Sequence, residues 1–112
     1  MLINLTPHPV TVFDGDTPIL TIPPSGTVAR LTETATEAPP IGGVAVTSVR
    51  LGKTTGLPEQ QDGVTYIVSM PLLMGVMTSA TWQRRDLVYP YGQVRDADGR
   101  IIGCRGLARI RS

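Results

Sequence analysis

The sequence predicts a small α+β protein, a mostly antiparallel sheet or open barrel of about seven to nine short strands with one amphipathic helix packed on it. Three observations lead to this fold class. Short runs rich in Val, Ile and Thr alternate with turn-forming Gly and Pro through most of the chain. One segment near residue 70 has the apolar spacing of a helix. The length of 112 residues fits a single domain, residues 1–112, with one core.

The first third of the chain predicts a β-meander. Asp14-Gly15 and the segment 23–26 combine Asp, Gly, Pro and Ser, which form tight turns between antiparallel strands. In the apolar runs between these turns, hydrophobic and polar residues alternate, so one face is expected in the core and one in water. The expected strands are Ile3–Leu5, Val10–Phe13, Ile19–Ile22 and Thr27–Leu31.

The middle of the chain predicts two long loops around one strand. Residues 32–43 are mostly Thr, Glu, Ala and Pro, and this composition offers little apolar area to bury, so we expect a surface loop there. Residues 44–51 alternate with one slip of phase, which predicts a long strand with a bulge. A second loop is expected over residues 52–63. Loops of this length are often functional.

The last part of the chain predicts a strand, the helix and a hairpin. Residues 64–68 form a compact apolar strand, and the helix is expected from about Met70 to Trp82, with Ser69 as its N-cap. The turn sequence Asp96–Gly99 predicts a tight hairpin. Three further strands are expected, over residues 87–89, 93–95 and 100–105.

Composition predicts a cytoplasmic protein. Aromatic residues make up 4% of the chain, so the core must be built mainly from aliphatic side chains. A single cysteine, Cys104, cannot close an internal disulfide, which fits a reducing compartment. The first residues resemble no signal peptide, and no apolar run has the length of a membrane span. We therefore expect the cytoplasm as the location and no membrane partner.

The most informative functional signal is the distribution of charge. Residues 84–112 hold seven arginines against three acidic residues, a net charge of +4, whereas residues 1–83 carry −3. Guanidinium groups bind phosphate and carboxylate oxygens two at a time, so the cluster predicts recognition of an anion. A tyrosine beside such a cluster can stack on a base. The candidate ligand-binding residues are Arg84, Arg85, Tyr89, Tyr91, Arg95 and Arg105.

The same arginines also fit a structural interpretation. They can occupy the solvated face of a sheet, each paired with a nearby acid such as Asp86, Asp96 or Asp98, and such surface pairs contribute little energy. Binding of duplex nucleic acid is disfavoured, because the pI near 7.9 and the acidic first part weaken attraction to a phosphate backbone. The fold decides between the two interpretations, because an anion site requires the arginine side chains to lie close together whereas a structural role does not.

Other reactive residues give weaker signals. His8 is the only histidine, and no cysteine or second histidine stands near it, so neither a metal site nor a catalytic pair is predicted. Cys104 lies next to Arg105, which can lower a thiol pKa, but a cysteine within a strand is usually a small buried hydrophobe. Met70, Met74 and Met77 have helical spacing and suit core packing or an adaptable surface. We predict no catalytic residue, metal or cofactor.

Several short motifs, spread over nearly the whole chain, resemble a family of small proteins encoded by bacteriophages and prophages, most of which have no assigned function. The resemblance implies a viral origin, and by analogy a protein directed at host defence. It implies no active-site residue. The motifs are Asn4-Leu5-Thr6-Pro7-His8, Ile22-Pro23-Pro24-Ser25-Gly26, Ala29-Arg30, Gly56-Leu57-Pro58, Tyr66-Ile67-Val68-Ser69, Arg85-Asp86-Leu87, Arg95-Asp96 and Gly99-Arg100-Ile101-Ile102-Gly103-Cys104.

These observations predict a non-enzymatic binding protein. Its expected ligand is a nucleotide or another anionic small molecule held by the arginines, as in a sponge for a nucleotide immune signal. The alternative is a protein-interaction module, an inhibitor of a host protein or a virion accessory protein, that uses the loops over residues 32–43 and 56–63. A homo-oligomer is expected in either case, because a small sheet with few aromatic residues gains stability when its exposed edges pair with another copy.

Overall fold

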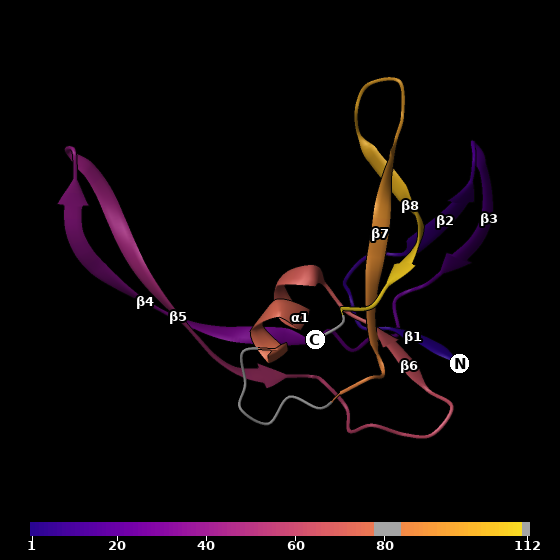
Figure 1. Ribbon diagram of the computed structural model, residues 1–112, viewed down its shortest axis with the longest axis horizontal. Coiled ribbons are helices and arrows are strands. Elements are labelled where there is room, and N and C mark those ends of the chain that lie inside the picture. Colours follow the sequence, from indigo (N-terminus) through magenta and orange to yellow (C-terminus); the bar gives the residue numbers. More distant parts are fainter. Residues whose placement is uncertain (78–83, 111–112) are drawn as a thin grey trace.

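The computed structural model describes residues 1–77 and 84–110, and within them the chain forms eight strands and one helix (Figure 1). A small α+β fold is therefore observed, although the helix is a minor part of it. In chain order the elements are β1 (Leu2–Asn4), β2 (Val10–Asp14), β3 (Thr17–Ile22), β4 (Arg30–Ile41), β5 (Val44–Thr55), β6 (Thr65–Ile67), α1 (Met70–Met77), β7 (Leu87–Arg95) and β8 (Ile101–Ala108).

Six of the strands form one curled sheet in the order β1-β6-β7-β8-β2-β3. The pairs β1/β6, β6/β7 and β2/β8 are parallel, and β7/β8 and β2/β3 are antiparallel. The sheet is thus mixed rather than mostly antiparallel. The predicted meander is correct for the β2–β3 hairpin but wrong for β1, which pairs with β6 some sixty residues later, Leu2 lying opposite Thr65. Such pairing depends on contacts between distant segments, which local turn chemistry does not encode.

The remaining two strands form a long antiparallel hairpin, here called the arm, that projects away from the sheet (Figure 1). The expected loop over residues 32–43 is therefore wrong, because most of it belongs to β4. Gly42 and Gly43 have φ angles of 58° and 79° and connect Ile41 to its partner Val44. Two consecutive positive φ angles are those of a type I′ turn, the turn that matches the twist of a two-stranded ribbon. Strand β5 confirms the predicted strand and extends it to Thr55, but the bulge expected at its phase slip is not found, because Thr47 and Ser48 pair in regular register with Glu37 and Thr36.

Helix α1 covers one face of the sheet. Ser69 caps it as predicted, because the Leu72 amide donates to Ser69 Oγ at 3.3 Å and the Leu73 amide donates to Ser69 O at 3.1 Å. Leu72 and Leu73 are buried. The expected continuation of the helix to Trp82 lies outside the described residues. The buried residues that pack together here are Leu5, Ala29, Tyr66, Val68, Leu72, Leu73 and Leu87.

A second buried cluster lies around β6, β7 and β8. It consists of Val10, Ile22, Ile67, Val88 and Cys104. Successive side chains of a strand point to opposite faces, so the neighbours Ile67 and Val68 of the β6 region fall into different clusters. The central segment of the sheet is therefore covered on both sides, and Ile67 and Val68 have no exposed area.

The C-terminal hairpin confirms the predicted turn. Asp96 accepts from the Asp98 and Arg100 amides through Oδ1, at 2.9 and 3.0 Å, and its carbonyl accepts from the Gly99 amide. The two short strands expected before this turn are one continuous strand, β7. Pro90 lies within that strand, opposite Leu107 of β8.

Candidate functional site

The arginine cluster is placed along the β7–β8 hairpin and at its base. Tyr89, Tyr91 and Arg95 alternate along β7 and therefore share one face of the ribbon. The two tyrosine rings meet edge to face with centroids 6.3 Å apart. Tyr91 is 62% exposed. The Arg95 guanidinium donates to Gly99 O at 2.7 Å and to Gln93 Oε1 at 3.0 Å, so it is held by its own hairpin.

Arg105 lies on the opposite face of this ribbon. Tyr91 pairs with Gly106 and Gln93 with Cys104, which leaves Arg105 across from Gly92 on the other side. A Cβ atom at Gly92 would lie 3.2 Å from Arg105 Cβ, which agrees with this register. Arg105 Nη1 donates to Gly15 O at 3.2 Å, in the turn between β2 and β3. The hairpin therefore separates Arg105 from Arg95 rather than bringing them together.

Arg84 and Asp86 form the one salt bridge found among the described residues. Arg84 Nε and Nη2 each donate to one Asp86 carboxylate oxygen, both at 2.8 Å, in a bidentate pair. Asp86 is 5% exposed, and its hydrogen bond is the main cause that raises the pKa of Arg84 above its ordinary value, against the opposing effect of burial. Arg84 thus acts as a structural partner of a buried acid, whereas Arg85 is exposed.

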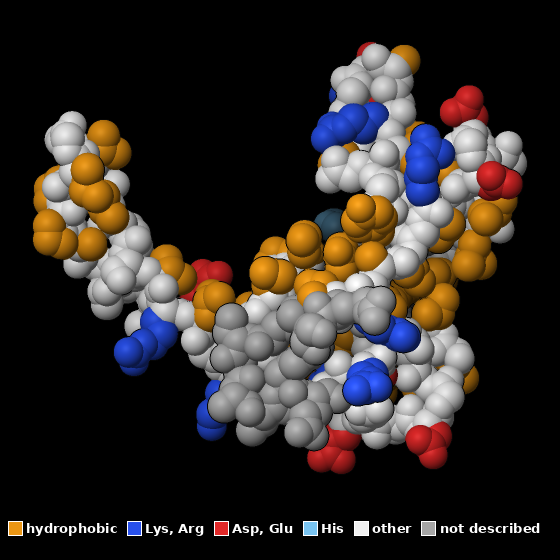
Figure 2. Space-filling model, in the orientation of Figure 1, with side chains coloured by type: hydrophobic (Ala, Val, Ile, Leu, Met, Phe, Trp, Pro, Cys, Tyr) orange, Lys and Arg blue, Asp and Glu red, His pale blue; other side chains and the backbone are white. Residues whose placement is uncertain are grey.

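Within the described residues, Arg84, Arg95 and Arg105 thus make separate contacts, with Asp86, Gly99 O and Gly15 O respectively. Figure 2 shows the basic side chains of the visible face as separate groups over the arm, the body and the β7–β8 hairpin. The pairing with acids expected under the structural interpretation holds for Arg84, whereas Arg95 and Arg105 bond to carbonyl groups and an amide. Tyr89 with Tyr91 is the one contact recorded within the set.

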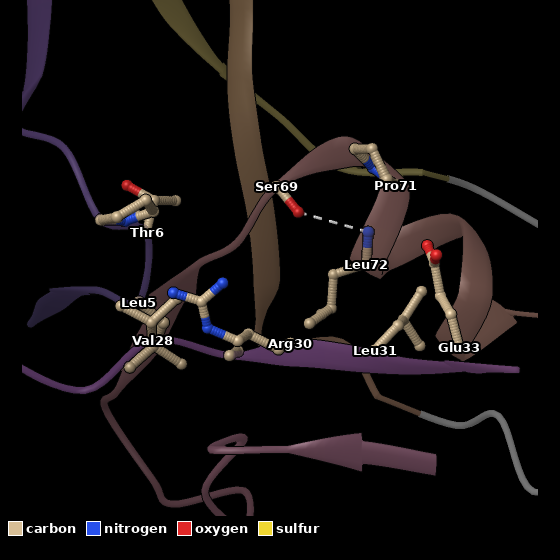
Figure 3. A pocket seen from close by; sticks show the side chains of 11 residues that line it. Leu5, Thr6, Val28, Arg30, Leu31, Glu33, Ser69, Pro71 and Leu72 are labelled. Atoms are coloured by element: carbon tan, nitrogen blue, oxygen red, sulfur yellow. Dashed lines mark hydrogen bonds between the residues drawn. The ribbon is translucent and has the colours of Figure 1, made fainter. Parts of the chain in front are cut away.

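The structure instead forms a pocket where the end of β1, the start of β4 and the start of α1 meet (Figure 3). Its volume is about 280 Å³. Its exposed wall is divided about equally between apolar and polar groups. The lining residues are Leu5, Thr6, Pro7, Val28, Ala29, Arg30, Leu31, Glu33, Ser69, Pro71 and Leu72.

Arg30 is the only cation of this pocket. Its guanidinium is directed toward Thr6, and Glu33 lies beyond Leu31 near helix α1 (Figure 3). Among the described residues, Arg30 makes neither a salt bridge nor a side-chain hydrogen bond. Its five N–H donors are therefore available to a ligand. The Ser69 hydroxyl accepts the Leu72 amide and keeps its own hydrogen free to donate.

The N-terminal segment that bounds the pocket is fixed by Asn4. This side chain is 1% exposed and makes four hydrogen bonds. Asn4 Nδ2 donates to His8 O at 2.8 Å and to Ile22 O at 3.1 Å. Asn4 Oδ1 accepts from the Thr6 amide at 2.9 Å and from Thr6 Oγ1 at 2.6 Å. Three of these four bonds reach the loop that carries Thr6 and the fourth reaches the end of β3, so the position of Thr6 is set from within the core.

The pocket was missed by arguments from charge because it contains one arginine rather than a cluster. Its segments do coincide with motifs of the phage-type resemblance: residues 4–8, Ala29-Arg30 and residues 66–69. Backbone hydrogen bonds join all three, since the Ala29 amide donates to Leu5 O at 2.9 Å and the Leu5 amide donates to Ile67 O at 2.8 Å. The signal in the sequence that could have located the pocket was this set of motifs, and only the fold shows that they lie together.

The remaining candidates have structural surroundings. His8 is exposed, and its carbonyl accepts from Asn4 and Thr6. Cys104 is buried, as the base rate for strand cysteines suggested, and burial raises the pKa of its thiol above the ordinary value. Within residues 1–77 and 84–110, no group of three His, Cys, Asp or Glu side chains is arranged to hold a metal ion. In the same residues, the helix is too short to cross a membrane.

Comparisons with protein-family models, with curated proteins and with solved structures each find no match to this chain. The fold and the pocket therefore carry the functional argument by themselves.

Proposed function

We propose that this chain is a non-enzymatic protein that binds a small anionic ligand of the nucleotide class in the Arg30 pocket. The observation that supports this is the guanidinium of Arg30, which has no partner in the described chain and borders a concave surface of mixed polar and apolar character. Arginine without an acid beside it is suited to a phosphate or carboxylate group. A viral origin and a role against host defence remain part of the proposal, through the family resemblance alone.

The other groups of the pocket fit the rest of such a ligand. Its volume, about 280 Å³, is at the lower end of the range for small-molecule sites, which suits a ligand near the size of a mononucleotide. Val28, Leu31 and Pro71, which keep exposed surface, offer apolar contact to a base or sugar face. Glu33 accepts hydrogen bonds from hydroxyl or amino groups at the far end of the pocket.

The test is the thermal unfolding of the purified protein with a panel of linear and cyclic nucleotides, with adenosine as the uncharged comparison. A ligand at about 100 times its Kd stabilises a protein by about 2.7 kcal/mol. For a domain of this length that corresponds to a rise in Tm of about 10 °C. Arg30→Ala removes a charge-assisted hydrogen bond, so we expect the Kd to rise about 10-fold to 100-fold.

Arg100→Ala is the matched control, because Arg100 is also exposed and its side chain makes no recorded hydrogen bond or salt bridge in the described chain. This variant is expected to keep the affinity of the natural sequence. The proposal fails if no nucleotide raises the Tm. It also fails if Arg30→Ala binds as tightly as the unchanged protein, since the anion would then be held elsewhere.

A second candidate function, the protein-interaction module, is favoured by the exposed arm, which contains most of the 32–43 segment assigned to it. Its test is capture of a protein from host lysate by the unchanged protein and by an arm variant. Loss of the partner with unchanged nucleotide binding supports this second function. Capture that is the same for both proteins argues against it.

A further inference from the structure

The arm is a two-stranded hairpin whose outer part touches no other element of the described chain (Figure 1). Its base is anchored, because Leu31 of β4 packs against Gly75 of helix α1, where there is no room for a side chain. Each strand has twelve residues, about twice the usual length. An isolated two-stranded hairpin is marginally stable in water. The arm therefore needs a covering surface that this chain does not supply.

The outer part of the arm is apolar. Figure 2 shows hydrophobic side chains gathered near the end of the arm. Ile41 is 70% exposed and Val44 is 66% exposed, on either side of the turn. Val49 and Leu51 on β5 are about half exposed. The side of the arm is hollowed by a groove of about 260 Å³, whose lining includes Ala35, Pro40 and Val46. Large apolar side chains in one exposed region indicate an interaction site.

The whole chain exposes more area than a monomer of its size. A compact protein of this mass exposes about 6,000 Å², whereas this chain exposes 8032 Å². Its Cα radius of gyration is 16.6 Å, compared with about 13 Å for a compact domain of this length. If two copies each covered half of the excess, the interface would bury about 2,000 Å² in total, which is in the range of obligate homodimers.

The strand edges indicate how a second copy would bind. Edge strands are usually protected by proline, by charge or by shortness. Strand β3 contains Pro18, β4 contains Pro39 and Pro40, and β1 has three residues. The outer edge of β5 has none of these protections over residues 44–49, which hold no proline and no charge. Among the described strands, β5 is thus the long edge open to pairing.

Antiparallel pairing of β5 with itself is also favoured by charge. The cations of β5, Arg50 and Lys53, both lie toward the body end of the strand. In an antiparallel pair they face the uncharged turn end of the other copy, whereas in a parallel pair they would lie beside their own counterparts. A two-fold axis across the arm produces the antiparallel arrangement.

We propose that the arm joins a second copy of this chain, with the β5 edges paired antiparallel in a four-stranded sheet of order β4-β5-β5-β4. The pairing satisfies the free backbone groups of β5 and places its exposed side chains beside those of the other copy. This proposal does not depend on the Arg30 pocket or on its ligand.

The first test is the mass of the purified full-length protein in solution, measured by light scattering over a range of concentrations. We expect about twice the 12.0 kDa of one chain. Val44→Lys combined with Val49→Lys places charge at exposed positions of β5, and we expect the dissociation constant of the dimer to rise at least 100-fold. The matched control is Ile19→Lys with Ile101→Lys, at equally exposed positions on β3 and β8, and it should remain dimeric.

The second test remains informative if the lysine variant fails to fold. Thr47→Cys and Ser48→Cys lie near the middle of the uncharged part of β5, where paired strands come within disulfide distance of each other. We expect at least one of them to form a disulfide-linked dimer on mild oxidation, and Ile19→Cys to form none.

Three results would overturn the proposal. One is a monomeric natural protein, which would mean that a different partner covers the arm. Another is a dimer as tight in the arm variant as in the natural chain, or one that the control variant weakens equally. The third is a dimer in which neither arm cysteine cross-links, because the arm would then bind a different surface of the second copy.

Discussion

Replacement of Asn4 by alanine is expected to destabilise the fold more than any exposed substitution. The side chain is 1% exposed and makes four hydrogen bonds between 2.6 and 3.1 Å. A neutral hydrogen bond contributes about 0.5–1.5 kcal/mol net. The bond to Ile22 O is buried, so water cannot replace it, whereas water can partly replace the other three. We therefore expect a loss of about 3 kcal/mol in the free energy of unfolding.

This loss has a measurable consequence for thermal unfolding. The entropy of unfolding of a domain of this length is about 0.24 kcal/mol per degree at its midpoint, so 3 kcal/mol lowers the Tm by about 12 °C. Calorimetry and urea unfolding give the two values independently. Gln93→Ala is the control, because Gln93 is an exposed amide whose recorded side-chain bond is to Arg95. A Tm of Asn4→Ala within about 4 °C of the natural protein would refute the reasoning.

Two further predictions concern strand β8. Gly103→Ala is expected to lower the free energy of unfolding, measured in urea, by about 1–3 kcal/mol, because the new Cβ would lie 2.5 Å from both Phe13 Cε1 and Thr11 O. Gly106→Ala is the control, because there is free space around Gly106, and it should unfold as the natural protein does. Equal midpoints for the two variants would contradict this packing. Burial raises the pKa of the Cys104 thiol in the folded protein, so as the pH rises the thiol ionises in the unfolded chain before it does in the folded protein. The free energy of unfolding should therefore fall as the pH rises above the ordinary thiol pKa. A thiol reagent should label Cys104 slowly in the native protein and rapidly in guanidinium chloride, and equally fast labelling would show that the thiol is accessible.

Local chemistry was sufficient to predict the elements whose contacts are close in sequence. The turn at Asp96–Gly99 is held by bonds of Asp96 to residues two to four positions away. Ser69 caps a helix that begins at the next residue. Strand β5 shows hydrophobic alternation within its own sequence. In each case, the residues that determine the structure lie within a few positions of it.

The arm was mispredicted because its sequence lacks the usual strand pattern. Alternation of apolar and polar residues arises when one face of a strand is buried, but both faces of β4 are exposed along most of its length. Thr, Glu, Ala and Pro then resemble a solvated loop. Strand β4 forms because it pairs residue by residue with β5, Ala35 opposite Val49 for example, and because the two glycines of the turn permit a type I′ geometry.

The arrangement of the arginines could not be predicted from the sequence for a related reason. Proximity in sequence suggested that the arginines of residues 84–112 gather, but the period of two in a strand ribbon places Arg95 and Arg105 on opposite faces. Arg30, in contrast, lies in the acidic part of the chain, and its neighbours in the pocket come from residues 5–7 and 69–72. Only the register of β1 on β6 and the approach of helix α1 bring these segments together.

The two proposals share strand β4 but can fail separately. Arg30 and Leu31 at its start belong to the pocket, and Ala38 to Ile41 at its end belong to the turn end of the arm. Every residue of the pocket comes from one chain, so a monomeric arm variant retains a complete ligand site. Conversely, the Arg30→Ala change lies at the body end of the strand, away from the edge proposed to pair, and leaves that edge intact. Loss of nucleotide binding therefore tests the pocket alone, and loss of the dimer tests the arm alone, because Arg30 lies on β4 at the base of the arm whereas Val44 and Val49 lie on β5 toward its turn.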